Sequence, residues 1–321
     1  MTRRHLEDSS SYRVISRRNS VSKNTAYKAV HEVSASVKDS FFIAKHFRPK
    51  WSGILCFDGT YLMVKNHFAE LERSWSDDKE GKFLHKMVAL LGTDFHTRDL
   101  PHYSLGDNEN MIDLVMYFKQ LRKNGYDLQV LVRDGNEAIT TAAKLAYERP
   151  IVTQLCHRHF LDKMDEKINC KELLQEKNKM IELKIRIVHI IKSADIEQAI
   201  LKMSEFVKEQ NKFRTSKTMN YLVDRFLRDF EELTMYLQYP KGLVPTTANV
   251  AENMNRQLKD RLRNMRGFQS IKSANDYLRM WCLKRRFQKF TDCKKPYAHL
   301  NGKAPLEIAC CDIKNIDYLS L

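Results

Sequence analysis

Glycine and proline are scarce in this chain of 321 residues, which has 10 glycines and 7 prolines. Because these residues interrupt helices and strands, their scarcity favours a helix-rich globular protein over a collagen-like or low-complexity chain. Long apolar runs are also missing, since those at residues 87–91 and 187–191 are far shorter than the roughly 20 residues of a membrane span. Residues 1–10 are charged and precede no apolar segment, so we expect neither a secretory signal peptide nor a membrane partner.

Cysteine forms no recognisable framework in this sequence. The seven cysteines are an odd number and are scattered along the chain without the spacing of a disulfide scaffold. Such usage suits a reducing compartment. We therefore expect a cytoplasmic protein, or a nuclear one if the source is eukaryotic.

Positive charge is concentrated at the two ends of the chain. The net charge is +15, from 55 Lys and Arg against 40 Asp and Glu. Residues 1–50 contain 11 basic and 4 acidic residues, and residues 241–321 contain 16 and 7, while the residues between are nearly balanced. Clustered Lys and Arg bind polyanions because they neutralise phosphates and release counterions. We expect a polyanion partner, although charge alone also fits a merely soluble basic protein.

The N-terminal residues 1–47 have the pattern of a helix-turn-helix DNA-binding segment followed by a linker. Two short helices are predicted at residues 12–18 and 23–33, with Ser22 as the N-cap of the second. Residues 35–52 are predicted to be a linker. The polar front of the second helix, which would contact DNA, consists of Lys23, Asn24, Thr25 and Lys28.

Residues 48–157 show the periodicity of a mixed α/β sheet. The apolar runs and amphipathic patterns predict the order βββαβαβ, with strands near 54–64, 87–91, 100–105, 128–132 and 151–155 and helices at 111–124 and 138–147. Residues 158–244 are rich in helix formers and are predicted to be an all-helical insertion, because they are too many for a connection. Residues 245–321 would complete the core with basic helices.

Asp58 and Asp134 each lie at or near the end of an apolar strand and are followed by glycine. A carboxylate in such a strand is costly unless it is paired or binds a metal ion. Adjacent strands are about 4.8 Å apart, so both acids could reach one divalent cation such as Mg²⁺, which prefers carboxylate, water and phosphate oxygens. The alternative is that each aspartate only begins an Asp-Gly turn.

Glu252 is the candidate third acid, at the start of a helix that also carries a basic stripe. The stripe residues are three or four positions apart and so share one helix face: Arg256, Lys259, Arg263 and Arg266. We expect Glu252 to bind metal while the stripe holds DNA phosphates.

Three ordered motifs in the chain resemble those of the DDE transposases of the Mutator-like group, which includes mutator-type bacterial and archaeal insertion-sequence enzymes. The motifs are Phe57-Asp58-Gly59-Thr60-Tyr61, then Val132-Arg133-Asp134-Gly135 followed by Cys156-His157-Arg158-His159, and finally Thr246-Thr247 through Glu252 to Asn255 and on to Arg266-Gly267-Phe268. The resemblance covers about residues 51–290. It implies an RNase H-like fold, with an all-helical insertion before the helix that bears the last acid.

The resemblance also implies an activity and its participants. The catalytic, metal-binding triad would be Asp58, Asp134 and Glu252, with Mg²⁺ as cofactor, replaceable by Mn²⁺. The enzyme would cleave DNA at transposon ends and join the freed 3′-hydroxyls to target DNA, as a homodimer or higher oligomer on double-stranded DNA. Cys156 and His159 would hold the fold around the site or position DNA rather than bind zinc, and His157 would be incidental.

Two alternatives remain open at this point. One is a catalytically decayed, transposase-derived DNA-binding protein, against which the retention of all three acids argues. The other is a different RNase H-like nuclease, against which the long helical insertion and the Cys-x-x-His motif argue.

Overall fold

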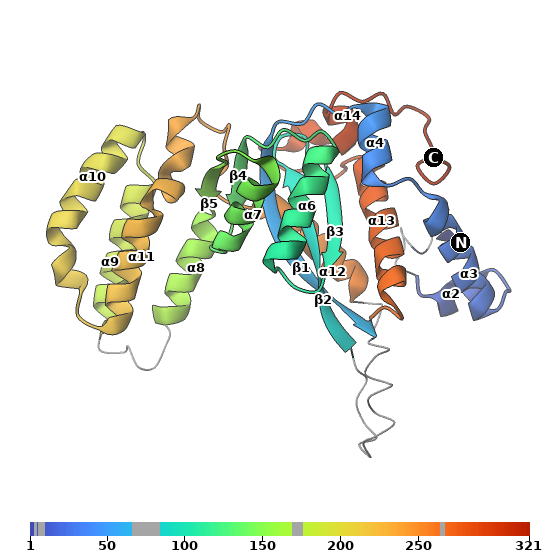
Figure 1. Ribbon diagram of the computed structural model, residues 1–321, viewed down its shortest axis with the longest axis horizontal. Coiled ribbons are helices and arrows are strands. Elements are labelled where there is room, and N and C mark those ends of the chain that lie inside the picture. The colour runs from blue at the N-terminus through green and yellow to red at the C-terminus, as the bar shows by residue number, and fades with distance from the viewer. Residues whose placement is uncertain (3–4, 6–9, 66–83, 169–175, 264–266) are drawn as a thin grey trace, which may run out of the picture. The chain divides into compact units, whose positions relative to one another are not determined.

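The computed structural model describes residues 1–2, 5, 10–65, 84–168, 176–263 and 267–321 (Figure 1). The chain divides into two compact units. The first unit contains Met1–Leu128, Thr141–Pro150 and Asn249–Leu321, and the second contains Gln129–Thr140 and Ile151–Ala248. None of the described helices is both long and apolar enough to span a bilayer.

A five-stranded mixed sheet has the strand order β3-β2-β1-β4-β5. The strands are β1 (Ile54–Lys65), β2 (Leu84–Asp94), β3 (His102–Gly106), β4 (Val130–Arg133) and β5 (Val152–Leu155). β2 pairs antiparallel with both β1 and β3, whereas β4 and β5 are parallel. With α6 (Met111–Lys123) and α7 (Glu137–Tyr147) in their places, the described elements of the sheet region follow the predicted order βββαβαβ.

The N-terminal helices α2 (Tyr12–Arg18) and α3 (Lys23–Ser36) begin where the sequence predicts. The Ser22 hydroxyl accepts a hydrogen bond from the Thr25 backbone N–H at 3.0 Å, which is the expected N-cap. Ile15 and Val30 are buried, and α3 packs against α13 (Ile271–Phe287) in the same unit.

The predicted linker at residues 35–52 contains a further helix, α4 (Ser40–Phe47), so that prediction is wrong for these residues. The Asp39 carboxylate caps α4 by accepting from the Phe42 backbone N–H at 2.8 Å. Ile43 is fully buried, and Phe42 and Phe47 pack against the same core. The segment is therefore an amphipathic helix, which its short length and the preceding serines conceal in the sequence.

The second unit is mainly helical after β5. Its helices are α8 (His157–Ile168), α9 (Lys177–Ile191), α10 (Ile196–Glu209) and α11 (Lys217–Thr234), with short 3₁₀ turns at Gln210–Phe213 and Met235–Gln238. They enclose a core of aromatic and aliphatic side chains that includes Phe206 and Phe226, whose ring centroids are 5.3 Å apart. The helical pattern of residues 158–236 thus belongs to a packed subdomain.

The C-terminal part of the first unit contains α12 (Asn249–Leu262), α13, a 3₁₀ turn (Ala298–Leu300) and α14 (Pro305–Ile308). A buried ion pair fixes α13, because Arg286 donates to both carboxylate oxygens of Asp99 at 2.8 Å. The two side chains are 1% and 0% exposed. Asp99 also accepts from the Trp51 indole N–H at 2.8 Å, so three distant segments meet at one carboxylate.

Breaking this ion pair is expected to destabilise the protein strongly. Arg286→Leu should lower the free energy of unfolding by about 3–5 kcal/mol, because Asp99 would stay buried without its ionic partner. Urea unfolding followed by circular dichroism measures this. The control is Arg263→Leu, which removes a 79% exposed arginine from the same unit. It should change the free energy of unfolding by under about 0.5 kcal/mol. Equal losses in the two variants would contradict the stabilising role of the Arg286–Asp99 ion pair.

Candidate active site

Asp58 lies in the middle of β1, opposite Leu91 of β2. Its neighbours Phe57 and Thr60 are 1% and 0% exposed, whereas Asp58 itself is half-buried. The Asn255 side-chain amide donates to Asp58 Oδ2 at 2.8 Å, and Asn255 is 2% exposed. A buried amide from α12 thus orients this carboxylate, as an acid in an apolar strand requires.

Glu252 lies one helical turn before Asn255 on α12. It is half-buried, and its helix packs against β1. The buried residues Ala251, Met254 and Leu258 anchor this helix in the first unit. Asp58 and Glu252 are therefore on facing elements of one compact unit.

Glu109 is an acid close to Gly59 of β1 that the sequence analysis did not single out, and it lies on the sheet face opposite to the Asp58 side chain, because consecutive strand residues point to opposite faces. It is half-buried in the loop between β3 and α6. A methyl group on Gly59 would collide with the Glu109 carboxylate, so only glycine lets this acid approach the strand. Glu109 belongs to a polar loop, which has no hydrophobic periodicity that could indicate its position. The only feature of the sequence that indicates this close approach is Gly59.

Asp134 follows β4 in the second unit. Its Oδ1 accepts from the Asn136 backbone N–H at 2.9 Å, which is the contact of an Asx turn. Two basic groups lie beside this turn, since a methyl group on Gly135 would lie 3.1 Å from Lys163 Nζ and 3.2 Å from Arg225 Nη2, and Arg225 also pairs with Asp229. The turn thus presents a carboxylate together with two cations.

Arg133, the motif residue before Asp134, is 2% exposed. Its guanidinium donates to the Glu232 carboxylate at 2.7 Å, the Thr140 hydroxyl at 2.5 Å and the Asp134 carbonyl at 2.6 Å. These contacts clamp the turn between α7 and α11. Arg133 is therefore a positioning residue for Asp134, a role that the sequence motif alone did not reveal.

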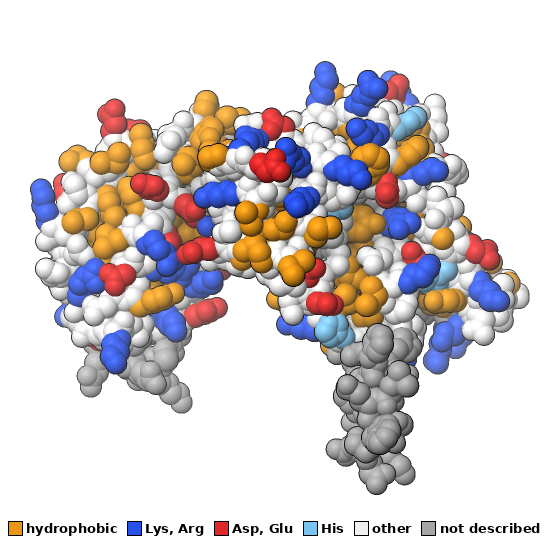
Figure 2. Space-filling model, in the orientation of Figure 1, with side chains coloured by type: hydrophobic (Ala, Val, Ile, Leu, Met, Phe, Trp, Pro, Cys, Tyr) orange, Lys and Arg blue, Asp and Glu red, His pale blue; other side chains and the backbone are white. Residues whose placement is uncertain are grey.

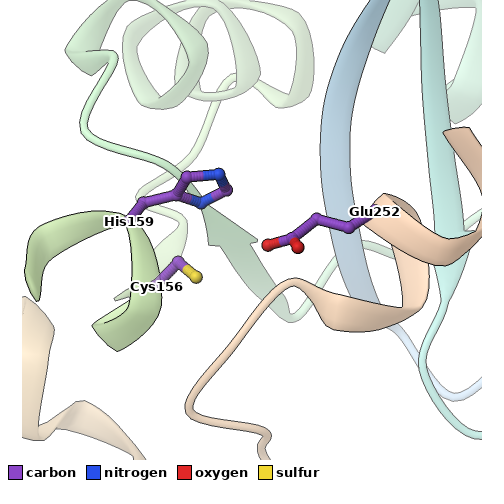
Figure 3. A group of neighbouring side chains, drawn as sticks. All are labelled: Cys156, His159 and Glu252. Atoms are coloured by element: carbon purple, nitrogen blue, oxygen red, sulfur yellow. The ribbon is translucent and has the colours of Figure 1, made fainter. Parts of the chain in front are cut away.

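Cys156 and His159 lie at the start of α8, and Figure 3 draws both side chains together with Glu252 of α12. Cys156 is fully buried, and its sulfur accepts from the Ala248 backbone N–H at 3.4 Å. The His157 backbone N–H donates to the Thr246 carbonyl at 2.9 Å. The first turn of α8 therefore holds the segment that leads into α12.

His157 has a structural role rather than an incidental one. Its ring is 5% exposed and donates from Nε2 to the Leu233 carbonyl at 2.6 Å. Burial lowers the pKa of His157 below its usual range, so the neutral ring is favoured in the folded protein. The side chain links α8 to the end of α11.

The residues predicted to contact DNA are exposed wherever the structure describes them. This holds for Lys23, Asn24, Thr25 and Lys28 on α3, for Arg256 and Lys259 on α12, and for Arg263, which directly follows that helix. Arg266 lies outside the described residues. Figure 2 shows Lys and Arg side chains spread over the displayed face and mixed with acidic ones.

A comparison with protein families identifies the chain. A family model described as "Transposase, Mutator family" matches residues 88–288, more than half of the chain. The matched stretch includes Asp134, the Cys-x-x-His motif and Glu252, whereas Asp58 precedes it. No curated protein matches the chain. The chain therefore belongs to the Mutator family of transposases.

Proposed function

We propose that this transposase is a DDE enzyme with an RNase H-like catalytic core. It would cleave a phosphodiester at each transposon end and join the freed 3′-hydroxyl to target DNA. The observation that carries the proposal is the hydrogen bond from Asn255 to Asp58, which sets this acid against the helix that bears Glu252. Asp134 in its basic turn would supply the third carboxylate.

The donor atoms of these residues fit a hard divalent cation. Asp58, Asp134 and Glu252 offer carboxylate oxygens, the ligands that Mg²⁺ and Mn²⁺ take together with water and phosphate oxygens. When bound, a pair of such ions supplies activation of the attacking oxygen and stabilisation of the leaving oxygen.

The chain's own residues prepare this chemistry. Asn255 donates to one oxygen of Asp58, which fixes the direction of the carboxylate. Lys163 and Arg225, beside Gly135, place positive charge where a phosphodiester would approach Asp134. No covalent protein intermediate is needed, because water and the DNA 3′-hydroxyl are the nucleophiles.

DNA recognition would be divided between two parts of the first unit. We infer that α2 and α3 act as a helix-turn-helix that reads the terminal repeats, and that the exposed stripe of α12 contacts phosphates. Because two transposon ends must be joined, the active form would be a dimer or higher oligomer on DNA. Such a protein would work in the DNA-containing compartment of the cell.

The catalytic assignment is tested by strand cleavage of DNA that carries the element's ends. Asp58→Asn, Asp134→Asn and Glu252→Gln should each reduce Mg²⁺-dependent cleavage by about a hundredfold or more, because charge stabilisation in the transition state is lost. EDTA should abolish cleavage by the unmodified protein. Asp260→Asn, on the exposed side of α12, is the matched control and should cleave normally. Normal cleavage by all three acid variants would refute the assignment, and end binding without any cleavage would indicate a decayed enzyme.

Asn255 is expected to act by positioning Asp58. Asn255→Leu should lower the free energy of unfolding by about 1–3 kcal/mol, because it leaves a half-buried carboxylate without this donor. Cleavage should fall as well, with kcat more affected than KM. Asn253→Leu, an exposed change on the same helix, should affect neither quantity, and a normal kcat in Asn255→Leu would contradict the positioning role.

The helix-turn-helix assignment is tested on the exposed front of α3. The double variant Thr25→Val, Lys28→Ala should lower affinity for terminal-repeat duplex by about tenfold or more, and affinity for unrelated duplex only a few-fold. Fluorescence anisotropy at fixed salt measures both. Deleting residues 1–47 would be a poorer test, because Ile15, Val30 and Ile43 belong to the core. Equal losses on the two duplexes would contradict sequence reading by α3.

A further inference from the structure

A cavity of about 770 Å³ lies within the first unit, between the N-terminal helices, α13 and the segment that contains Phe268. Its volume is in the range of roughly 300–1,000 Å³ that is typical of small-molecule sites. The triad acids do not line it. Lys23 and Asn24 of α3 do, so part of the predicted DNA-reading helix opens onto this cavity.

Aromatic rings form much of the cavity wall. His5 stacks on Tyr12 with a centroid distance of 4.7 Å and an interplanar angle of 19°. Tyr12 meets Tyr27 edge-on at 5.3 Å, and the Phe268 and Tyr277 rings are 5.5 Å apart. Flat apolar walls of this kind accept a planar ring by stacking.

The interior also carries polar groups. Tyr277 is 3% exposed, and among the described residues its hydroxyl has no hydrogen-bond partner. Burial raises the pKa of Tyr277, so the hydroxyl stays protonated and can donate. The neighbouring Asp276 is 5% exposed and accepts from Lys272 at 2.9 Å and from His31 at 3.4 Å. A buried, unused hydroxyl is costly unless a ligand satisfies it.

Cationic side chains line the outer part of the cavity. Arg13, Lys23 and Lys65 are exposed, and none forms an ion pair with another residue in the part of the chain that the structure describes. Three cations that have no ion-pair partner among the described residues lie beside an aromatic cavity, and together they attract an anion that is attached to a flat ring.

We propose that this cavity binds one unstacked nucleotide of a DNA strand. The base would lie among the rings and accept from Tyr277, and its phosphates would contact Arg13, Lys23 and Lys65. An apolar peptide would not need the cations, and a simple anion would not need the aromatic walls. A paired base stays within the duplex stack, so the ligand is a single-stranded or frayed segment. The inference rests on the proposed action on DNA, but not on the catalytic acids.

The test uses the full chain in EDTA, so that catalysis plays no part. The probe is a single-stranded dodecanucleotide containing 2-aminopurine, followed by anisotropy for affinity and by quenching of the base on stacking. Tyr277→Phe, which keeps the ring, should weaken binding by about fivefold and reduce the quenching. Arg13→Gln should weaken binding by about three- to tenfold, whereas the control Arg17→Gln, an exposed change on the same helix, should weaken it by less than about twofold.

Other outcomes would overturn the proposal. If Tyr277→Phe and Arg13→Gln both keep wild-type affinity and quenching, the cavity does not bind the strand. This conclusion would hold even if the cleavage assay supports the catalytic acids. Equal losses of affinity in Arg13→Gln and Arg17→Gln would show that the net positive charge of the surface, and not the cavity, accounts for binding. Displacement of the strand by free dAMP at equal nucleotide concentration would reassign the cavity to a free nucleotide. Conversely, cavity-dependent binding without any cleavage would contradict only the catalytic proposal.

Discussion

The hydrogen bond between Asn255 and Asp58 is the contact on which the functional architecture of the first unit depends. A carboxylate inside an apolar strand needs a donor or a cation, and a buried amide on α12 provides the donor at 2.8 Å. The same bond joins α12 to β1, together with the buried residues Ala251, Met254 and Leu258 of that helix. Glu252, one turn before Asn255, is half-buried, while Arg256 and Lys259 are exposed.

The N-terminal helices are built into the first unit rather than attached by a free arm. Ile15, Val30 and Ile43 are all buried, and α3 packs against α13. The ion pair of Arg286 with Asp99 in turn holds α13 to the loop after β2. A DNA segment bound at α3 would therefore lie next to the aromatic cavity, because Lys23 and Asn24 of α3 line it.

Local patterns predicted the elements well where one strong period governs them. The strands of the sheet, the helices of the insertion and the N-cap at Ser22 follow from apolar periodicity and from a hydroxyl at a helix start. The prediction was wrong at α4, because eight residues with three phenylalanines give too short a pattern to indicate which side is buried. Glu109 was missed because a loop acid has no period at all.

The sequence by itself determined the order of strands and helices, the concentration of positive charge at the two ends and the motifs that indicate the family, since each depends on residue type and short spacing. Tertiary structure decided which groups meet. Asn255 and Asp58 are 197 residues apart, and neither this bond, nor the approach of Glu109 to Gly59, nor the unused Tyr277 hydroxyl has a local signature. Such contacts form only when whole helices and strands pack together. Which side chains face each other depends on this packing and not on the local secondary-structure propensity of the sequence.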